Sequence, residues 1–97
     1  MLRHIAMFRL KVDAPEGSMQ SILAGLALLA QNISQIDTYT YGRDLGLREG
    51  NFDLAVVADF ADAAAFASYV EHPDHQAFVQ DQLRPVLAER AALQFEI

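Results

Sequence analysis

The sequence predicts an α+β domain of the ferredoxin-like type, in which a four-stranded antiparallel sheet carries helices on one face. Three observations lead to this prediction. Apolar residues alternate along residues 2–11, recur every three to four positions along residues 19–31, and run without a break at the centre of residues 52–60. With the remaining segments, the order becomes β-α-β-β-α-β, and we expect the 97 residues to form one domain, 1–97.

The first half of the chain contains a strand, a helix and a second strand. In residues 2–11, every second side chain falls on the same face of the expected strand, and this face includes His4 and Phe8. The apolar stripe of residues 19–31 is typical of a helix that lies on a sheet. Residues 36–43 are rich in Thr and Tyr, which favours a second strand, and a glycine-punctuated loop follows.

The third and fourth strands are expected at residues 52–60 and near the C-terminus, where apolar residues alternate over residues 93–97. The centre of the third strand, residues 54–58, is apolar on both faces. A strand of this kind is normally covered on both sides. The helices provide one cover, and either another sheet layer or a partner subunit provides the other, so this strand favours a dimer.

Prolines divide the second helical region. Asp62 is a suitable N-cap for a helix over residues 63–71. Pro73 ends that helix and can occupy the first turn of the next, which we expect over residues 74–82. Pro85 then ends or kinks the segment.

Composition limits the possible functions. The apolar share is 53%, slightly above the usual value of about 45–50%, which favours an apolar subunit interface. The net charge is −6 and the seven basic residues are scattered, so we expect no nucleic-acid partner. No apolar run is long enough to cross a membrane, no secretion signal is evident, and cysteine is absent. We therefore expect a cytoplasmic protein that binds no membrane.

Three side chains are expected to meet between the sheet and the helices. His4 lies on the strand face shared with Phe8, Tyr69 lies on the same side of its helix as Phe66, and His75 is in helical step with Phe78. A histidine can act as a general base or acid, and a tyrosine hydroxyl can orient a ligand oxygen. Apolar surroundings with a few converging polar groups are typical of small-ligand sites.

Each of these residues also has a structural interpretation. His4 can be a hydrogen-bonded core histidine and Tyr69 a core aromatic. His72 precedes Pro73 and can satisfy a helix end. Although His72 and His75 are three residues apart, Pro73 interrupts the helical geometry that two metal ligands would need, so no metal site is expected. The strand faces of Tyr39 and Tyr41 stay undecided at this point.

The chain resembles the stress-responsive dimeric α/β-barrel family, often called Dabb. The resemblance covers nearly the whole chain and rests on four groups of residues. They are Arg3-His4-Ile5 with Phe8 and Lys11; Gly42-Arg43-Asp44; Asn51-Phe52-Asp53-Leu54-Ala55 with Val57 and Asp59-Phe60; and Tyr69-x-x-His72-Pro73-x-His75-x-x-Phe78.

This resemblance implies a homodimer in which two four-stranded sheets pack face to face as a barrel, with the helices outside. One plant member of the family is a polyketide cyclase whose working histidine and tyrosine belong to the same motif. On matching positions, the resemblance implies His75 as general base and Tyr69 as a substrate-holding residue. It implies that His4 lines the pocket, and we expect Phe8, Phe66 and Phe78 to contact substrate beside it. Such chemistry needs no cofactor.

The sequence is therefore compatible with three functions. The first is a homodimer that binds an apolar, oxygen-bearing small molecule. The second is a cofactor-independent enzyme of the polyketide-cyclase or isomerase type, with His75 as base. The third is a structural or stress-protective oligomer, which predicts a filled core and no cavity beside His75.

Overall fold

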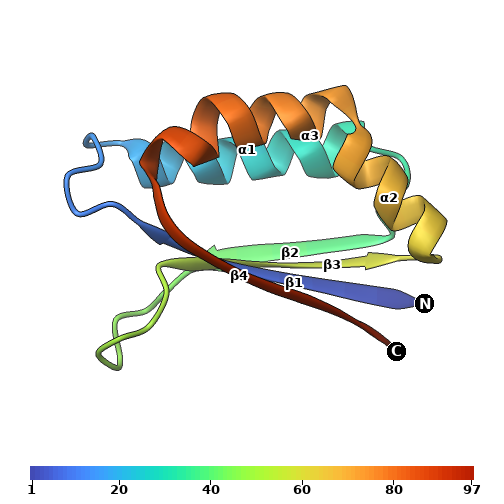
Figure 1. The fold of residues 1–97 in the computed structure, drawn as a ribbon, viewed down its shortest axis with the longest axis horizontal. Coiled ribbons are helices and arrows are strands. Elements are labelled where there is room, and N and C mark those ends of the chain that lie inside the picture. Colours follow the sequence, from blue (N-terminus) through green and yellow to red (C-terminus); the bar gives the residue numbers. More distant parts are fainter.

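The four strands form one antiparallel sheet in the order β2-β3-β1-β4 in this computed structural model, which describes residues 1–97. All of the helices cover one face of the sheet, and the other face is open (Figure 1). The strands are β1 (Leu2–Leu10), β2 (Thr38–Arg43), β3 (Leu54–Phe60) and β4 (Leu87–Glu96). The predicted ferredoxin-like arrangement is confirmed.

The helical layer consists of five segments. The long helix α1 (Ser18–Asn32) connects β1 to β2, while α2 (Ala63–Glu71) follows β3. The chain then continues as α3 (Pro73–Phe78), the π-helical turn η1 (Val79–Leu83) and the 3₁₀ turn η2 (Arg84–Val86). None of these helices is both long and apolar enough to cross a membrane.

The predicted helix caps and breaks occur at the expected residues. The Asp62 carboxylate accepts a hydrogen bond of 2.8 Å from the backbone N–H of Ala65 and so starts α2. Pro73 occupies the first turn of α3, and His72 is the cap residue between the two helices. The chain therefore turns sharply between α2 and α3 while both helix ends keep hydrogen-bond partners.

Two element boundaries differ from the sequence prediction. The expected helix over residues 74–82 changes at Val79 into a π-helical turn, in which the N–H of Arg84 bonds to the carbonyl of Val79. Pro85 has no N–H to continue an α-helical ladder, which accounts for the irregular end. The last strand begins at Leu87 and not near residue 93. Its first half contains Glu89 and Arg90, whose polarity obscured the strand pattern.

The core lies between the sheet and the helices. Side chains from alternate positions of β1 and β3, such as Ala6 and Phe60, point toward the helices and are buried. They pack against Ile22, Leu26 and Leu29 of α1. This pattern confirms the strand face predicted for His4 and the apolar stripe predicted for the first helix.

The open face of the sheet carries apolar side chains on its central and edge strands. Met7 and Val57 belong to it, and β4 adds Leu93 and Phe95, which are 56% and 44% exposed. The loop between β2 and β3 extends on this same side, away from the helices (Figure 1). The apolar pattern of β3 predicts that both faces of the sheet are covered. In a single chain this second face stays uncovered.

An ion pair at one end of the sheet lies on the open face. Arg3 donates to both carboxylate oxygens of Asp59, at 2.8 and 3.0 Å, and the Thr38 hydroxyl donates to the same carboxylate at 2.8 Å. The hydrogen bond from Arg3 lowers the pKa of Asp59 to about 2. These contacts fix β2, β3 and β1 to one another at one end of the sheet.

Candidate functional site

A cavity of about 300 Å³ lies between the sheet and the helices. Its wall includes five of the six residues expected to form the site: His4 and Phe8 of β1, Tyr69 of α2, and His75 and Phe78 of α3. Ten of the 14 residues in the wall are hydrophobic, and none is acidic. This mixture of an apolar wall with a few polar groups is typical of small-ligand sites.

Phe66, the sixth expected residue, is not part of the cavity wall. Its ring packs 4.9 Å from the His4 ring and 5.5 Å from the Phe60 ring, measured between centroids. Phe66 therefore packs against His4 within the core. This position does not support the predicted contact between Phe66 and a substrate.

The break between α2 and α3 orients the His75 ring. In an uninterrupted helix the carbonyl of Val70 would accept from the N–H of Asp74, but that N–H donates to Nδ1 of His72 at 3.1 Å. The Val70 carbonyl lies 3.2 Å from Nδ1 of His75. A carbonyl only accepts, so Nδ1 carries the proton and Nε2 keeps a free lone pair.

The electrostatic surroundings keep His75 neutral. Burial lowers the pKa of its imidazole; the hydrogen bond to Val70 acts in the opposite direction, and the charge of Arg90 lowers it further. A neutral imidazole with a free Nε2 lone pair can accept a proton or a hydrogen bond from a ligand.

Two tyrosine hydroxyls form the second polar group of the site. The hydroxyls of Tyr39 and Tyr69 are 2.8 Å apart, and both residues line the cavity. Burial raises the pKa of both, so both stay protonated at neutral pH. One proton is shared within the pair, which leaves the other available to a ligand oxygen. The Tyr69 and His75 ring centroids are only 4.3 Å apart, so these two rings are in contact.

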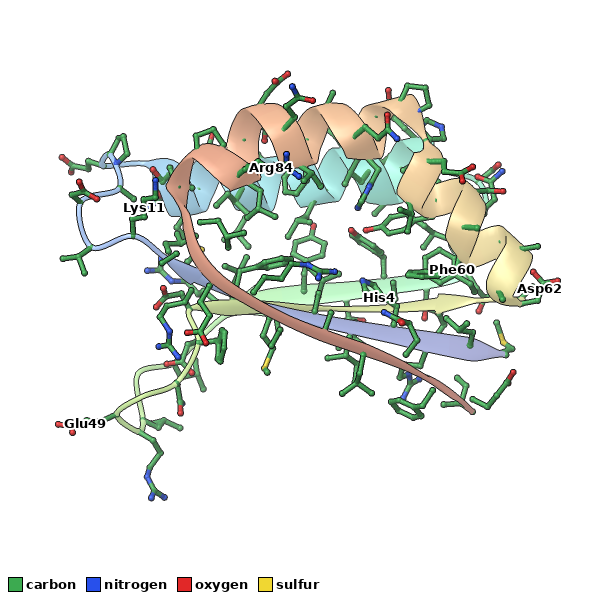
Figure 2. All side chains as sticks on the ribbon, viewed as in Figure 1. His4, Lys11, Glu49, Phe60, Asp62 and Arg84 are labelled. Atoms are coloured by element: carbon green, nitrogen blue, oxygen red, sulfur yellow. The ribbon has the colours of Figure 1, made fainter.

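His4 points from β1 into the space between the sheet and the helices (Figure 2). The side-chain amide of Gln94 on β4 lies 2.9 Å from Nδ1 of His4. Burial, assisted by the charges of Arg90 and His75, lowers the pKa of His4 to about 4. His4 is therefore neutral at physiological pH and adds a polar atom without adding a charge.

The structure places four polar residues in this region that the sequence pattern does not identify. The weak pattern of β2 does not define the face of Tyr39, and the pairing of Tyr39 with Ala58 places it on the helix-facing side. Arg84, Arg90 and Gln94 lie in segments whose beginnings the sequence did not define. The only sequence signal near Arg84 is the neighbouring Pro85, which indicates that the helix becomes irregular there.

His72 has a structural role in this arrangement, as one of the two interpretations predicted. It caps α3 and does not line the cavity. No group of three His, Cys, Asp or Glu side chains lies close enough together to bind a metal ion.

Comparison with known proteins agrees with the fold. A dimeric ferredoxin-like protein of unknown function from Thermobifida fusca is 38% identical, with a TM-score of 0.91 over 99% of this chain and 90% of that one. A Dabb family protein from Mesorhizobium loti is 24% identical, with a TM-score of 0.82 over 99% and 95%. The hydroxynitrile lyase of Passiflora edulis is 23% identical, with a TM-score of 0.85 over 99% and 92%.

Similarity to the last two proteins, below 25% identity, shows the fold alone. A search of curated proteins gives no match. The sequence model of the family described as Stress responsive A/B Barrel Domain (Dabb) matches residues 2–97. The resemblance noted in the sequence is thereby confirmed, and the chain belongs to the Dabb family.

Proposed function

We propose that this protein is a homodimer that binds an apolar, oxygen-bearing small molecule in the cavity between its sheet and helices. The observation that carries the proposal is the convergence of His75, Tyr69 and Tyr39 on one apolar cavity of about 300 Å³. The cavity lies beside His75, where a purely structural oligomer would have a filled core. Its volume falls at the lower end of the range typical of small-molecule sites.

The polar groups suit a ligand oxygen. The Tyr39–Tyr69 pair has one O–H proton to donate, and Nε2 of His75 can accept from a hydroxyl. Buried polar groups of this kind favour a ligand that completes their hydrogen bonds over one that leaves them unpaired. The remaining wall, including Phe8 and Phe78, suits an apolar ligand body.

The dimer is supported by the open face of the sheet. Its apolar side chains include Met7, Val57, Leu93 and Phe95, and they lie opposite the helix-covered face. The protein from Thermobifida fusca, at 38% identity, is described as dimeric. A second copy packed on this face would cover the apolar surface and leave the ligand cavity on the outer side of each sheet.

A second candidate function is cofactor-independent enzymatic proton transfer, which the orientation of His75 favours. The bond from Nδ1 to the Val70 carbonyl leaves Nε2 as a base, and the hydroxyl pair beside it can stabilise a developing oxyanion. The cyclase reaction implied by the sequence resemblance, like the alternative isomerase reaction, needs a base and an oxygen donor. So does lyase chemistry, which the name of the structurally similar Passiflora edulis protein suggests.

The binding proposal is tested with a neutral oxygen-bearing probe, 4-phenylbutyramide, followed by NMR titration. Val79 lines the cavity and is half-buried, so Val79→Trp should fill part of it and abolish saturable binding. Val12→Trp is the matched control, because Val12 is fully exposed and outside the cavity. Equal binding by the two folded variants, or no binding by the unmodified protein, would refute the proposal.

One substitution separates the binding protein from the enzyme. Once a candidate substrate is turned over, His75→Ala should abolish turnover while the dimer persists. In a pure binding protein the same variant should retain the probe, and there would be no turnover to lose. Turnover that survives His75→Ala would exclude His75 as the base.

A further inference from the structure

Two arginines on the cavity wall have no carboxylate partner. Of the seven basic residues, Arg3 is paired with Asp59 and Arg9 with Glu89. Arg84 and Arg90 line the cavity, yet neither guanidinium makes an ion pair or a side-chain hydrogen bond. The chain has 13 acidic residues, and none of them lines this cavity.

The two arginines come from different segments that the fold brings together. Arg84 begins η2, and Figure 2 shows it at the level of the helices. Arg90 lies on β4 opposite Phe8 of β1, on the face of the sheet that the helices cover. Both residues are exposed, which places them where the apolar cavity opens to solvent.

The charge of Arg90 reaches the polar groups inside the cavity. It contributes to the lowered pKa of both His4 and His75, and no carboxylate opposes it there. The cavity is therefore a local positive site in a protein whose net charge is −6. Guanidinium groups bind carboxylates through paired N–H donors, and they are less hydrated than ammonium groups.

We propose that the ligand of this cavity is an amphiphilic organic acid, whose carboxylate is bound by Arg84 and Arg90 and whose apolar body lies against Phe8 and Phe78. This inference rests on the proposed binding function and names its ligand class. A single negative charge is favoured over a polyanion, because the overall negative charge of the protein repels multiply charged ligands.

In this arrangement the two ends of the site have separate tasks. The arginines hold the acid group at the opening, while Nε2 of His75 and the Tyr39–Tyr69 pair face an oxygen further along the ligand. A bound carboxylate also offsets the charge of Arg90, so the pKa of His75 should be higher with a bound acid than with a bound neutral analogue, which only buries the imidazole further.

The test compares 4-phenylbutyrate with its amide, 4-phenylbutyramide, which has nearly the same shape and no charge. The unmodified protein should bind the acid at least about tenfold more tightly than the amide, and added salt should reduce this preference. The double substitution Arg84→Gln, Arg90→Gln should remove the preference by weakening acid binding, so that the acid and the amide bind with similar affinity. Arg48→Gln is the matched control, because Arg48 lies on an exposed loop outside the cavity and should keep the preference.

The conservative change Arg90→Lys should keep part of the preference, which separates loss of charge from loss of structure; circular dichroism checks the fold of each variant. Equal affinity of the unmodified protein for acid and amide would overturn this inference and leave the binding function standing. A preference that persists in the double variant would overturn it as well. Failure of both probes to bind would remove the inference and the binding function together.

Discussion

Nδ1 of His75 lies 3.2 Å from the carbonyl oxygen of Val70, across the break that Pro73 makes between two helices. This contact sets which imidazole nitrogen carries the proton, because the carbonyl has none to give. The local sequence accounts for this contact in the run Tyr69-Val70-Glu71-His72-Pro73-Asp74-His75. Nδ1 of His72 accepts the hydrogen bond from the N–H of Asp74, so the Val70 carbonyl is available to His75.

The first prediction concerns the tautomer of His75. At neutral pH its imidazole should be uncharged and protonated at Nδ1, because burial lowers its pKa and Val70 accepts from Nδ1. Long-range ¹H–¹⁵N NMR of the imidazoles distinguishes the two tautomers, and His75→Gln identifies the signal. A neutral ring protonated at Nε2 would contradict the proposed base.

The second prediction concerns the hydroxyl pair of Tyr39 and Tyr69. Removing one buried partner leaves the other short of a hydrogen bond, so Tyr39→Phe should lower the free energy of unfolding by about 1–2 kcal/mol. Tyr69→Phe should have a similar effect. Because both substitutions remove the same bond, the double variant should lose less than the sum of the two. Denaturant unfolding of all four proteins measures this coupling, and simple additivity would show that the hydroxyls do not interact.

The third prediction is a loss of stability in mild acid. The pKa of His4 is about 4 in the folded protein and 6.5 as an ordinary histidine, so between these values the unfolded chain binds more protons. The free energy of unfolding should therefore fall as the pH drops from 6.5 toward 4, by at most about 1.4 kcal/mol per pH unit from this residue. His75, whose pKa is also lowered, acts in the same direction.

The matching measurement is denaturant unfolding at a series of pH values and one fixed protein concentration. His4→Gln removes the titrating group, so its stability should depend less steeply on pH over this range. A variant with the same slope as the unmodified protein would show that His4 is already protonated in the fold, or that it is not buried.

The fourth prediction concerns the open face of the sheet. Leu93→Asp places a charge among the apolar side chains proposed to contact a second copy, so it should weaken dimerisation by about a hundredfold or more. Leu28→Asp on α1 is the matched control, because Leu28 and Leu93 are both 56% exposed in a single chain. Sedimentation of both variants at micromolar concentration gives the answer. Equal association states for the two variants would place the interface elsewhere.

The fifth prediction concerns the contact between α1 and α3. A Cβ atom at Gly25 would lie 2.6 Å from the Phe78 ring and would also collide with the side chain of Gln82. Gly25→Ala should therefore destabilise the fold by about 1–3 kcal/mol, although alanine favours helices. Thermal unfolding measures the change, and Ala24→Ser on the exposed side of α1 is the control. An unchanged or raised Tm would mean that the helices can separate at little cost.

The sequence predicted most of the fold because its local signals agree with the final packing. Three local signals each favour the structure that the folded chain adopts. They are the alternation that includes His4 and Phe8, the apolar stripe of α1 and the Asp62 cap. It failed at residues 79–92, where a π-helical turn and a polar strand start carry no periodic pattern.

The same limitation determined which parts of the site could be predicted. His75, Tyr69 and His4 lie in segments with clear periodicity, so their faces followed from spacing. Tyr39 required the pairing of β2 with β3, and Arg90 required the register between β4 and β1, both of which are long-range contacts. Phe66 shares a helix side with Tyr69, yet it packs behind the cavity wall because His4 and Phe60 occupy its surroundings.

The central claim is that the space beside His75 holds a ligand. The most direct measurement is an NMR structure of the protein saturated with 4-phenylbutyrate, using contacts between probe and protein protons. The account predicts contacts from the phenyl ring to Phe8, Phe78 and Leu83, with the carboxylate toward Arg90. Contacts confined to the open face of the sheet, or none that saturate, would contradict it.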